Sequence, residues 1–318
     1  MNLKNMEYNL RLLFFIIILN EMKISKEYKL KSLNLNNEII ITIEGTGTHQ
    51  QILYDYHNYK PSKIIINNKY TTNLIDDYYI YGLDDEIYNI AIKWNEALSD
   101  CSFMFYYLTS ILSIDLSNFD SSKVTTMQSM FEGCFNLISL DLSNLNTSSV
   151  IYMTNMFEGC FNLISLDLSN LNTSSVIYMT SMFNGCSRLK SLDLSKLNTS
   201  SVIYMSNMFE DCIRLISLDL NNLNTSSVTN MQYMFSNCKR LISLDLSNLN
   251  TSSVTNMEYM FGDCRSLMSL DLSNLNTSSV TDMHNMFSNC NRLISLDLSK
   301  LDTSSVTNMQ SMFINLVH

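Results

Sequence analysis

Cysteine recurs in this chain at a fixed interval, and evenly spaced thiols could bind a metal or form cross-links. A zinc site needs four ligands that converge on one point, and neither a C-x-x-C pair nor a histidine accompanies these cysteines. One small apolar thiol per interval is typical of a buried position. We therefore predict a column of buried free thiols, with cross-links between neighbouring repeats and metal binding as alternatives. Seven of the eight cysteines follow this interval: Cys134, Cys160, Cys186, Cys212, Cys238, Cys264 and Cys290.

Methionine and histidine are the other residues that could carry metal or acid–base chemistry. Met153 and Met156, with their copies, could be soft copper ligands, but methionine at this spacing beside phenylalanine is far more often core filling. The four histidines stand in no H-E-x-x-H or nucleophile motif. Serine and aspartate are copied in every repeat, whereas a catalytic group depends on one special environment. We therefore expect no enzymatic activity.

The dipeptide Met-Phe marks the period of the chain. It begins at nine evenly spaced positions, from Met104, Met130 and Met156 through to Met312, with the same 26-residue step each time. Periods of this length indicate supersecondary units that stack on one another. A single unit could not bury its own apolar edge, so we expect the units to share one continuous core.

Each unit contains two hydrophobic patterns. The segment from Leu137 to Leu145 reads L-x-x-L-x-L-x-x-L, the short-strand pattern of a leucine-rich repeat. Val150, Met153 and Met156 have the spacing of one side of a helical turn. The sequence therefore predicts an α/β solenoid. We expect a right-handed, leucine-rich-repeat-like stack of coils with a parallel β-sheet on one face and short helical or 3₁₀ turns on the other.

The residues before the repeats divide into two parts. Residues 12–19 read LLFFIIIL and follow Lys4 and Arg11, the order found in a secretory signal, although a buried apolar strand is the alternative. Residues 38–45, 62–70 and 87–94 read as short strands, with a hairpin turn at Asn67 and Asn68. The expected organisation is a hydrophobic leader over 1–24, a β-rich cap over 25–103, and a solenoid of eight repeats and a partial ninth over 104–318.

Aspartate forms a second periodic set, in the middle of the predicted strand. Stacked strands would place these carboxylates in one file on the open side of the sheet. Neighbouring carboxylates repel, so we expect some of their pKa values to be raised, and the file to be a weak Ca²⁺ ladder or simply a solvated face. No other cofactor is expected. The candidate ladder consists of Asp141, Asp167, Asp193, Asp219, Asp245, Asp271 and Asp297.

The repeats differ most beside the cysteine slot. Several cations stand there, and variation on an otherwise invariant frame indicates an edge that binds a partner, although exposed positions also vary when packing does not restrain them. The candidate partner-binding residues are Arg214, Lys239, Arg240, Arg265 and Arg292.

Composition excludes some classes of partner. The formal charge is −10 and no run of lysine and arginine occurs, so we expect no binding to nucleic acid. The apolar run at residues 12–19 is too short to span a bilayer, so we expect no transmembrane segment. Oligomeric state does not follow from the sequence.

The repeat VTNMQYMFSNCKRLISLDLSNLNTSS resembles the 26-residue repeat of BspA-like leucine-rich-repeat surface proteins. The resemblance covers Met104 to about Phe313. It implies a curved solenoid, an extracellular or cell-surface location, and adhesion or recognition of a protein or glycan on a cell or matrix surface, without enzymatic activity. The alternative is a cytoplasmic scaffold that docks other proteins.

Overall fold

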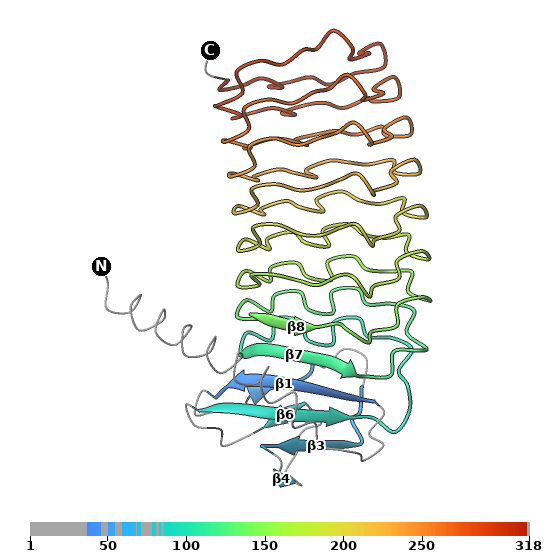
Figure 1. Cartoon of the computed structure of the whole chain (residues 1–318), viewed down its shortest axis with the longest axis vertical. Coiled ribbons are helices and arrows are strands. Elements are labelled where there is room, and N and C mark those ends of the chain that lie inside the picture. The colour runs from blue at the N-terminus through green and yellow to red at the C-terminus, as the bar shows by residue number, and fades with distance from the viewer. Residues whose placement is uncertain are drawn as a thin grey trace, which may run out of the picture. The chain divides into compact units, whose positions relative to one another are not determined.

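The computed structural model describes residues 37–45, 50–54, 59–67, 69–70, 78–80, 83 and 86–316. The leader predicted over residues 1–24 lies outside the described residues. Residues from Asn37 onward form one compact unit, in which a small set of strands is followed by stacked coils (Figure 1). The strands are β1 (Glu38–Glu44), β2 (Gln50–Gln51), β3 (Lys63–Ile66), β4 (Lys69–Tyr70), β5 (Tyr79–Ile80), β6 (Ile87–Lys93), β7 (Ile111–Asn118) and β8 (Ser139–Asp141).

The segment before the repeats forms most of a six-stranded sheet with the order β4-β3-β6-β1-β7-β8. The three predicted strands are confirmed, because isoleucine-rich runs alternate between the core and the outer side of the sheet. Strands β3 and β4 pair with Ile66 opposite Lys69, so the chain turns at Asn67 as predicted, and Asn68 lies outside the described residues. Strand β1 pairs antiparallel with β7, the first strand of the repeats, and so occupies the edge of the first coil.

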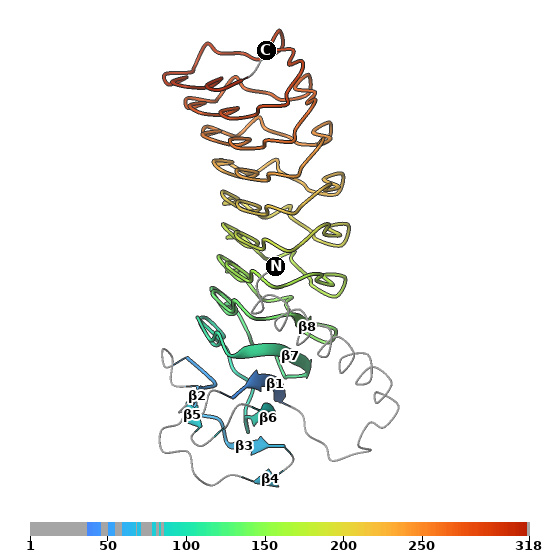
Figure 2. The ribbon, with the colours of Figure 1, turned by 90° about the vertical axis from the view of Figure 1, so that its left-hand side faces the viewer.

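Each repeat unit forms one coil, and backbone hydrogen bonds join it to the next coil through the Met-Phe segment. Alternate amides of this segment donate to carbonyls of the following coil at N···O distances of 2.7–3.0 Å. In one such ladder the amide of Met127 donates to the carbonyl of Tyr152, Ser129 to Thr154, Phe131 to Met156, and Gly133 to Glu158. Figure 2 shows the same stack turned by 90°. The outward side chains of residues 126–133 and their copies are called the Met–Phe face below.

The helical turns predicted on this face are not supported. Among the described residues no helix occurs, and the Met-Phe segment is a run of turns in which an amide donates to the carbonyl three residues earlier. Two positions per coil have left-handed backbone, for example Asn155 with φ 57° and Gly159 with φ 70°. Left-handed residues interrupt a right-handed helix. They also turn alternate amides toward the next coil, where those amides find acceptors.

The opposite side of the coils carries the Ser-Leu-Asp-Leu segments. We call the outward side chains of residues 138–143 and their copies the open face. Among the described residues, a parallel pair of strands forms on this side only between β7 and β8, and a single bridge joins Ser269 to Ser295 farther along. The prediction of a continuous parallel sheet on this side is therefore wrong beyond the first coils.

Isolated hydrogen bonds, rather than a regular ladder, join the later coils on the open side. The amides of Ile216, Met268 and Ile294 donate to the carbonyls of Lys190, Ile242 and Met268 in the preceding coil at 3.0–3.1 Å. A parallel ladder needs a hydrogen bond at every second residue of each strand. These single contacts therefore hold neighbouring coils together without forming a continuous sheet.

The predicted inward columns are confirmed. Leu137, Val150, Met153, Met156 and Phe157 have no exposed surface, so the methionines fill the core. The cysteines are free, buried thiols as predicted. Their Sγ atoms donate to a phenylalanine carbonyl of the preceding coil at 3.0–3.3 Å, and burial raises the pKa of Cys212 to about 12. A protonated, enclosed thiol is a poor nucleophile and a poor metal ligand.

Candidate recognition surfaces

The predicted file of aspartates lies on the open face, and each carboxylate folds back on its own backbone. Its Oδ1 atom accepts a hydrogen bond from the amide two residues later at 2.8–2.9 Å, as in the pair Asp167 and Ser169. The aspartates of the file from Asp167 to Asp297 are exposed. The file is therefore a series of locally satisfied Asx turns.

The expectation of raised pKa values is wrong. Hydrogen bonds from Ser195, Ser247 and Ser273 hold the pKa values of the preceding aspartates below their usual value. Repulsion between neighbouring aspartates is present but smaller, as at Asp271. Two donors per carboxylate outweigh like charges that water screens.

No group of three or more histidine, cysteine, aspartate or glutamate side chains that could hold a metal ion occurs in the part of the chain that the structure describes. Calcium binding along the file stays a prediction.

Changing Asp193, Asp245 and Asp271 together to alanine is expected to lower the thermal midpoint at neutral pH, because three turns lose an ionised acceptor. A carboxyl whose folded pKa is lowered stabilises the fold above its unfolded pKa and loses that contribution as pH falls through the folded value. The deficit should therefore shrink below about pH 3.8. Thermal unfolding followed by circular dichroism, with Ca²⁺ and with chelator at constant ionic strength, measures both effects. A variant as stable as the wild type at neutral pH would contradict the Asx-turn explanation.

The predicted cationic edge lies where each coil turns from the cysteine slot toward the open face. Arg214, Arg240, Arg265 and Arg292 are exposed, and Lys239 is partly exposed. Arg265 forms an ion pair with Asp263 at 2.8 Å, with 55% of its side chain exposed. Within the described residues, the other three arginines form no ion pair. Their charges therefore face solvent.

The open face also carries an apolar stripe that the leucine pattern did not reveal. One residue before each Ser-Leu-Asp-Leu segment, a large apolar side chain points outward. The stripe consists of Ile164, Ile216, Ile242, Met268 and Ile294, which are 39%, 40%, 45%, 43% and 84% exposed. Lys190 takes this position in one coil. The side-chain alternation of a strand would place a residue two positions before an inward leucine on the inward side as well, so the pattern L-I-S-L-D-L predicted no exposed stripe.

The Met–Phe face differs from coil to coil, in contrast to the open face. At the position that bridges successive coils, a stack of Tyr152, Tyr178 and Tyr204 gives way to Asn230, Asn256, Asp282 and Asn308. Tyr152 and Tyr204 remain 41% and 42% exposed. This face thus presents different side chains on one repeated backbone.

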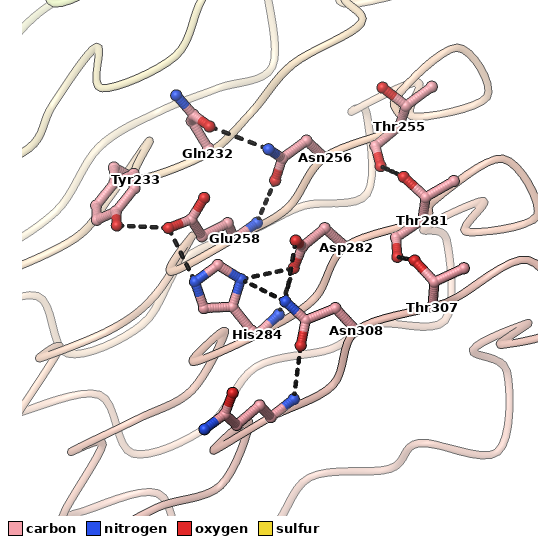
Figure 3. Close-up of polar contacts among 11 residues, drawn as sticks. Gln232, Tyr233, Thr255, Asn256, Glu258, Thr281, Asp282, His284, Thr307 and Asn308 are labelled. Atoms are coloured by element: carbon pink, nitrogen blue, oxygen red, sulfur yellow. Dashed lines mark hydrogen bonds and ion pairs between the residues drawn. The ribbon is translucent and has the colours of Figure 1, made fainter.

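A polar cluster occupies the later coils of the Met–Phe face (Figure 3). The Tyr233 hydroxyl donates to Glu258 Oε1 at 2.6 Å, and that oxygen lies 2.9 Å from His284 Nε2. His284 Nδ1 lies 2.7 Å from Asp282 Oδ1, so carboxylates contact both ring nitrogens. Sequence motifs missed this cluster because its members come from three successive coils. The repeat register, which superimposes Glu258 and His284, was the available signal.

A column of glutamates lies in the earlier coils of the same face. Glu132 Oε2 accepts from Asn155 at 3.1 Å, and Asn184 donates to Glu158 Oε1 at 3.5 Å. Burial, then the charges of Glu132 and Glu210, raise the pKa of Glu158 to about 7. The earlier coils of this face therefore carry a partly buried acidic column.

No helix in the described part of the chain is long and apolar enough to cross a membrane.

The repeats match the family described as "Mycoplasma protein of unknown function, DUF285" over residues 99–217, 161–270 and 214–318, which together cover more than half of the chain. The chain belongs to this family. Membership in the DUF285 family accords with the repeated sequence and assigns no activity. The finer resemblance to BspA-like proteins is not established by this match.

Other comparisons add little to the DUF285 assignment. No curated protein matches the chain. Among solved structures, the chain is similar to one in the "Crystal structure of TLR13-ssRNA13 complex", with 16% identity, a TM-score of 0.24, and coverage of 59% of this chain. The chain spans 31% of the length of that protein. A similarity this weak supports no conclusion about a shared ligand.

Proposed function

We propose that this protein is a non-enzymatic recognition scaffold, a BspA-like solenoid that binds a protein or glycan on a cell or matrix surface. The observation that carries the proposal is the contrast between the two faces. The open face repeats the same residues, whereas the Met–Phe face changes its outward residues on an invariant, hydrogen-bonded backbone. Such an arrangement can evolve a specific surface without altering its core.

The tyrosine stack of the Met–Phe face is the part best suited to hold a macromolecule. Exposed tyrosines combine apolar area with a hydroxyl and lose little conformational entropy on binding. Stacking at 4.8 and 4.9 Å holds Tyr152, Tyr178 and Tyr204 in one orientation before any ligand arrives. Polar residues elsewhere on the same face, including Glu158, would orient the ligand.

The test uses the tagged full-length chain and two matched variants. The first changes Tyr152, Tyr178 and Tyr204 to serine, and the control changes Ser165, Ser191 and Ser217 of the open face to alanine. Binding to immobilised matrix proteins and to a glycan array is measured. We expect the tyrosine variant to bind about tenfold or more weakly than the wild type, and the control to be unchanged. Equal binding by the tyrosine variant would overturn the assignment of this face.

Location decides between surface recognition and the alternative of a cytoplasmic docking scaffold. We propose export, supported by the apolar run at residues 12–19 after Lys4 and Arg11. The tagged chain is expected in the medium or on the cell surface, and deletion of residues 1–22 is expected to retain it in the cytosol. Cytosolic protein in both cases would favour the docking scaffold.

A further inference from the structure

The apolar stripe of the open face lies between two rows of opposite charge, the cationic edge beside that face and the aspartate file on it. Within a coil, Arg240 stands two residues before Ile242, and Asp245 stands three residues after it. All three side chains are exposed, and the leucines between them are buried. The same order recurs around Ile216 and Ile294. The two residue sets singled out in the sequence, the cationic edge and the aspartate file, therefore flank a stripe that neither set predicts.

The charges beside Ile242 are not neutralised by ion pairs among the described residues. Arg240 and Arg292 form no ion pair there, and Asp245 uses one carboxylate oxygen for the amide of Ser247. The outer atoms of these charged groups thus remain free to meet a partner. The apolar stripe accounts for five of the large exposed hydrophobic side chains, a concentration typical of an interaction surface.

The spacing of the stripe restricts the partner. Its apolar groups recur once per coil except at Lys190, and the partner must offer apolar groups and charges with the same repeat over several coils. A second copy of this chain matches this repeat at every coil, because its coils have the same spacing as those of the first copy. Closed two-fold symmetry is also the commonest arrangement of soluble assemblies.

We propose that the open face is a homodimer interface in which two stacks lie face to face with their axes parallel. A two-fold axis along the stack direction exchanges the two sides of the face. It brings the Ile stripe of one copy onto that of the other, and the arginine row onto the partner's aspartate row. Turning one copy end over end would instead set arginine against arginine. Electrostatics therefore selects the parallel arrangement.

The proposed interface leaves the Met–Phe faces of both copies free, because they lie on the opposite sides of the coils. Dimerisation would thus present two recognition surfaces at once, which strengthens binding to a surface that carries many ligands. The dimer does not depend on the proposed function, since the two faces share no residues.

The experiment measures the mass of the full-length chain by sedimentation at increasing protein concentration, with four variants. In the proposed dimer, residue 242 of one copy faces residue 242 of the other, so Ile242→Glu brings two negative charges together. We expect the dissociation constant of the dimer to rise about tenfold or more. Arg240→Glu and Asp245→Arg are each expected to weaken the dimer, because each creates a like-charge pair. The double variant Arg240→Glu/Asp245→Arg is expected to restore it, because opposite charges face each other again.

Tyr204→Ser on the Met–Phe face is the matched control, and we expect it to dimerise like the wild type. Circular dichroism verifies that every variant folds. A wild type that stays monomeric at all concentrations would overturn the proposal. A dimer insensitive to Ile242→Glu, or a charge swap that fails to restore association, would show that other residues make the contact. A wild type that dimerises but binds no matrix protein or glycan would instead count against the proposed function alone.

Discussion

Phe209→Ala is expected to lower the free energy of unfolding by about 3–5 kcal/mol, the range for removing a buried aromatic ring from a packed core. Phe209 is 1% exposed, and its ring stacks on Phe183 and Phe235 at 5.7 Å on both sides. Neither neighbour can close the gap, because backbone hydrogen bonds hold their coils in register. Because each coil contacts only its neighbours, the loss would weaken the stack at this point. Urea unfolding followed by circular dichroism measures the effect.

The matched control is Phe161→Ala. Phe161 also stacks on a phenylalanine, Phe135, at 4.8 Å, but it is 44% exposed. Its removal creates no enclosed cavity, so we expect a loss of about 1 kcal/mol or less. Hydrogen exchange should show faster exchange of amides near Phe209 in the first variant alone. Equal losses in the two variants would mean that ring stacking, rather than enclosure, stabilises the coils.

Glu158→Gln is expected to stabilise the fold at alkaline pH and to have little effect at acidic pH. Burial and the neighbouring glutamates raise the pKa of Glu158 from 4.5 to about 7, so the folded state holds a proton that the unfolded state releases. Stability therefore falls as pH rises from about 4.5 to about 7, and the penalty is complete above that range. Glutamine keeps the amide contacts without the charge. The gain above about pH 7 should be about 1 kcal/mol, since the half-exposed carboxyl is partly screened by water.

Thermal midpoints of the wild type and Glu158→Gln across this pH range provide the measurement. Asp167→Asn is the control, because hydrogen bonds from Ser169 lower the pKa of Asp167. The pH dependence of this variant should be opposite to that of Glu158→Gln. The ionised Asp167 stabilises the fold above its unfolded pKa, so Asp167→Asn should be less stable than the wild type at neutral pH and equally stable in acid. A difference between Glu158→Gln and wild type that does not change with pH would show that the carboxyl is solvated like a surface glutamate.

The sequence by itself determined the features that depend on local pattern. The repeat interval, the inward leucine, methionine and phenylalanine columns, and the buried thiols all follow from which side chains must avoid water. The strands β1, β3 and β6 follow from alternating isoleucines of high β-propensity. The residues of the cationic edge and of the aspartate file could also be predicted from the sequence. The local pattern was sufficient for these features, because a side chain that recurs at the same place in every repeat is buried or exposed in the same way whatever path the backbone takes between repeats.

Tertiary structure alone decided how the backbone runs and which surface residues meet. Val150, Met153 and Met156 fit one side of a helix, yet they also fit successive turns, and the choice came from amides that find acceptors in the next coil. The backbone hydrogen bonds between coils also decided that the open face has no continuous ladder, because only isolated bonds form there beyond β8. The cluster at His284 and the stripe at Ile242 likewise depend on the stacking register. These properties arise from contacts between coils, whereas a sequence pattern describes one coil at a time.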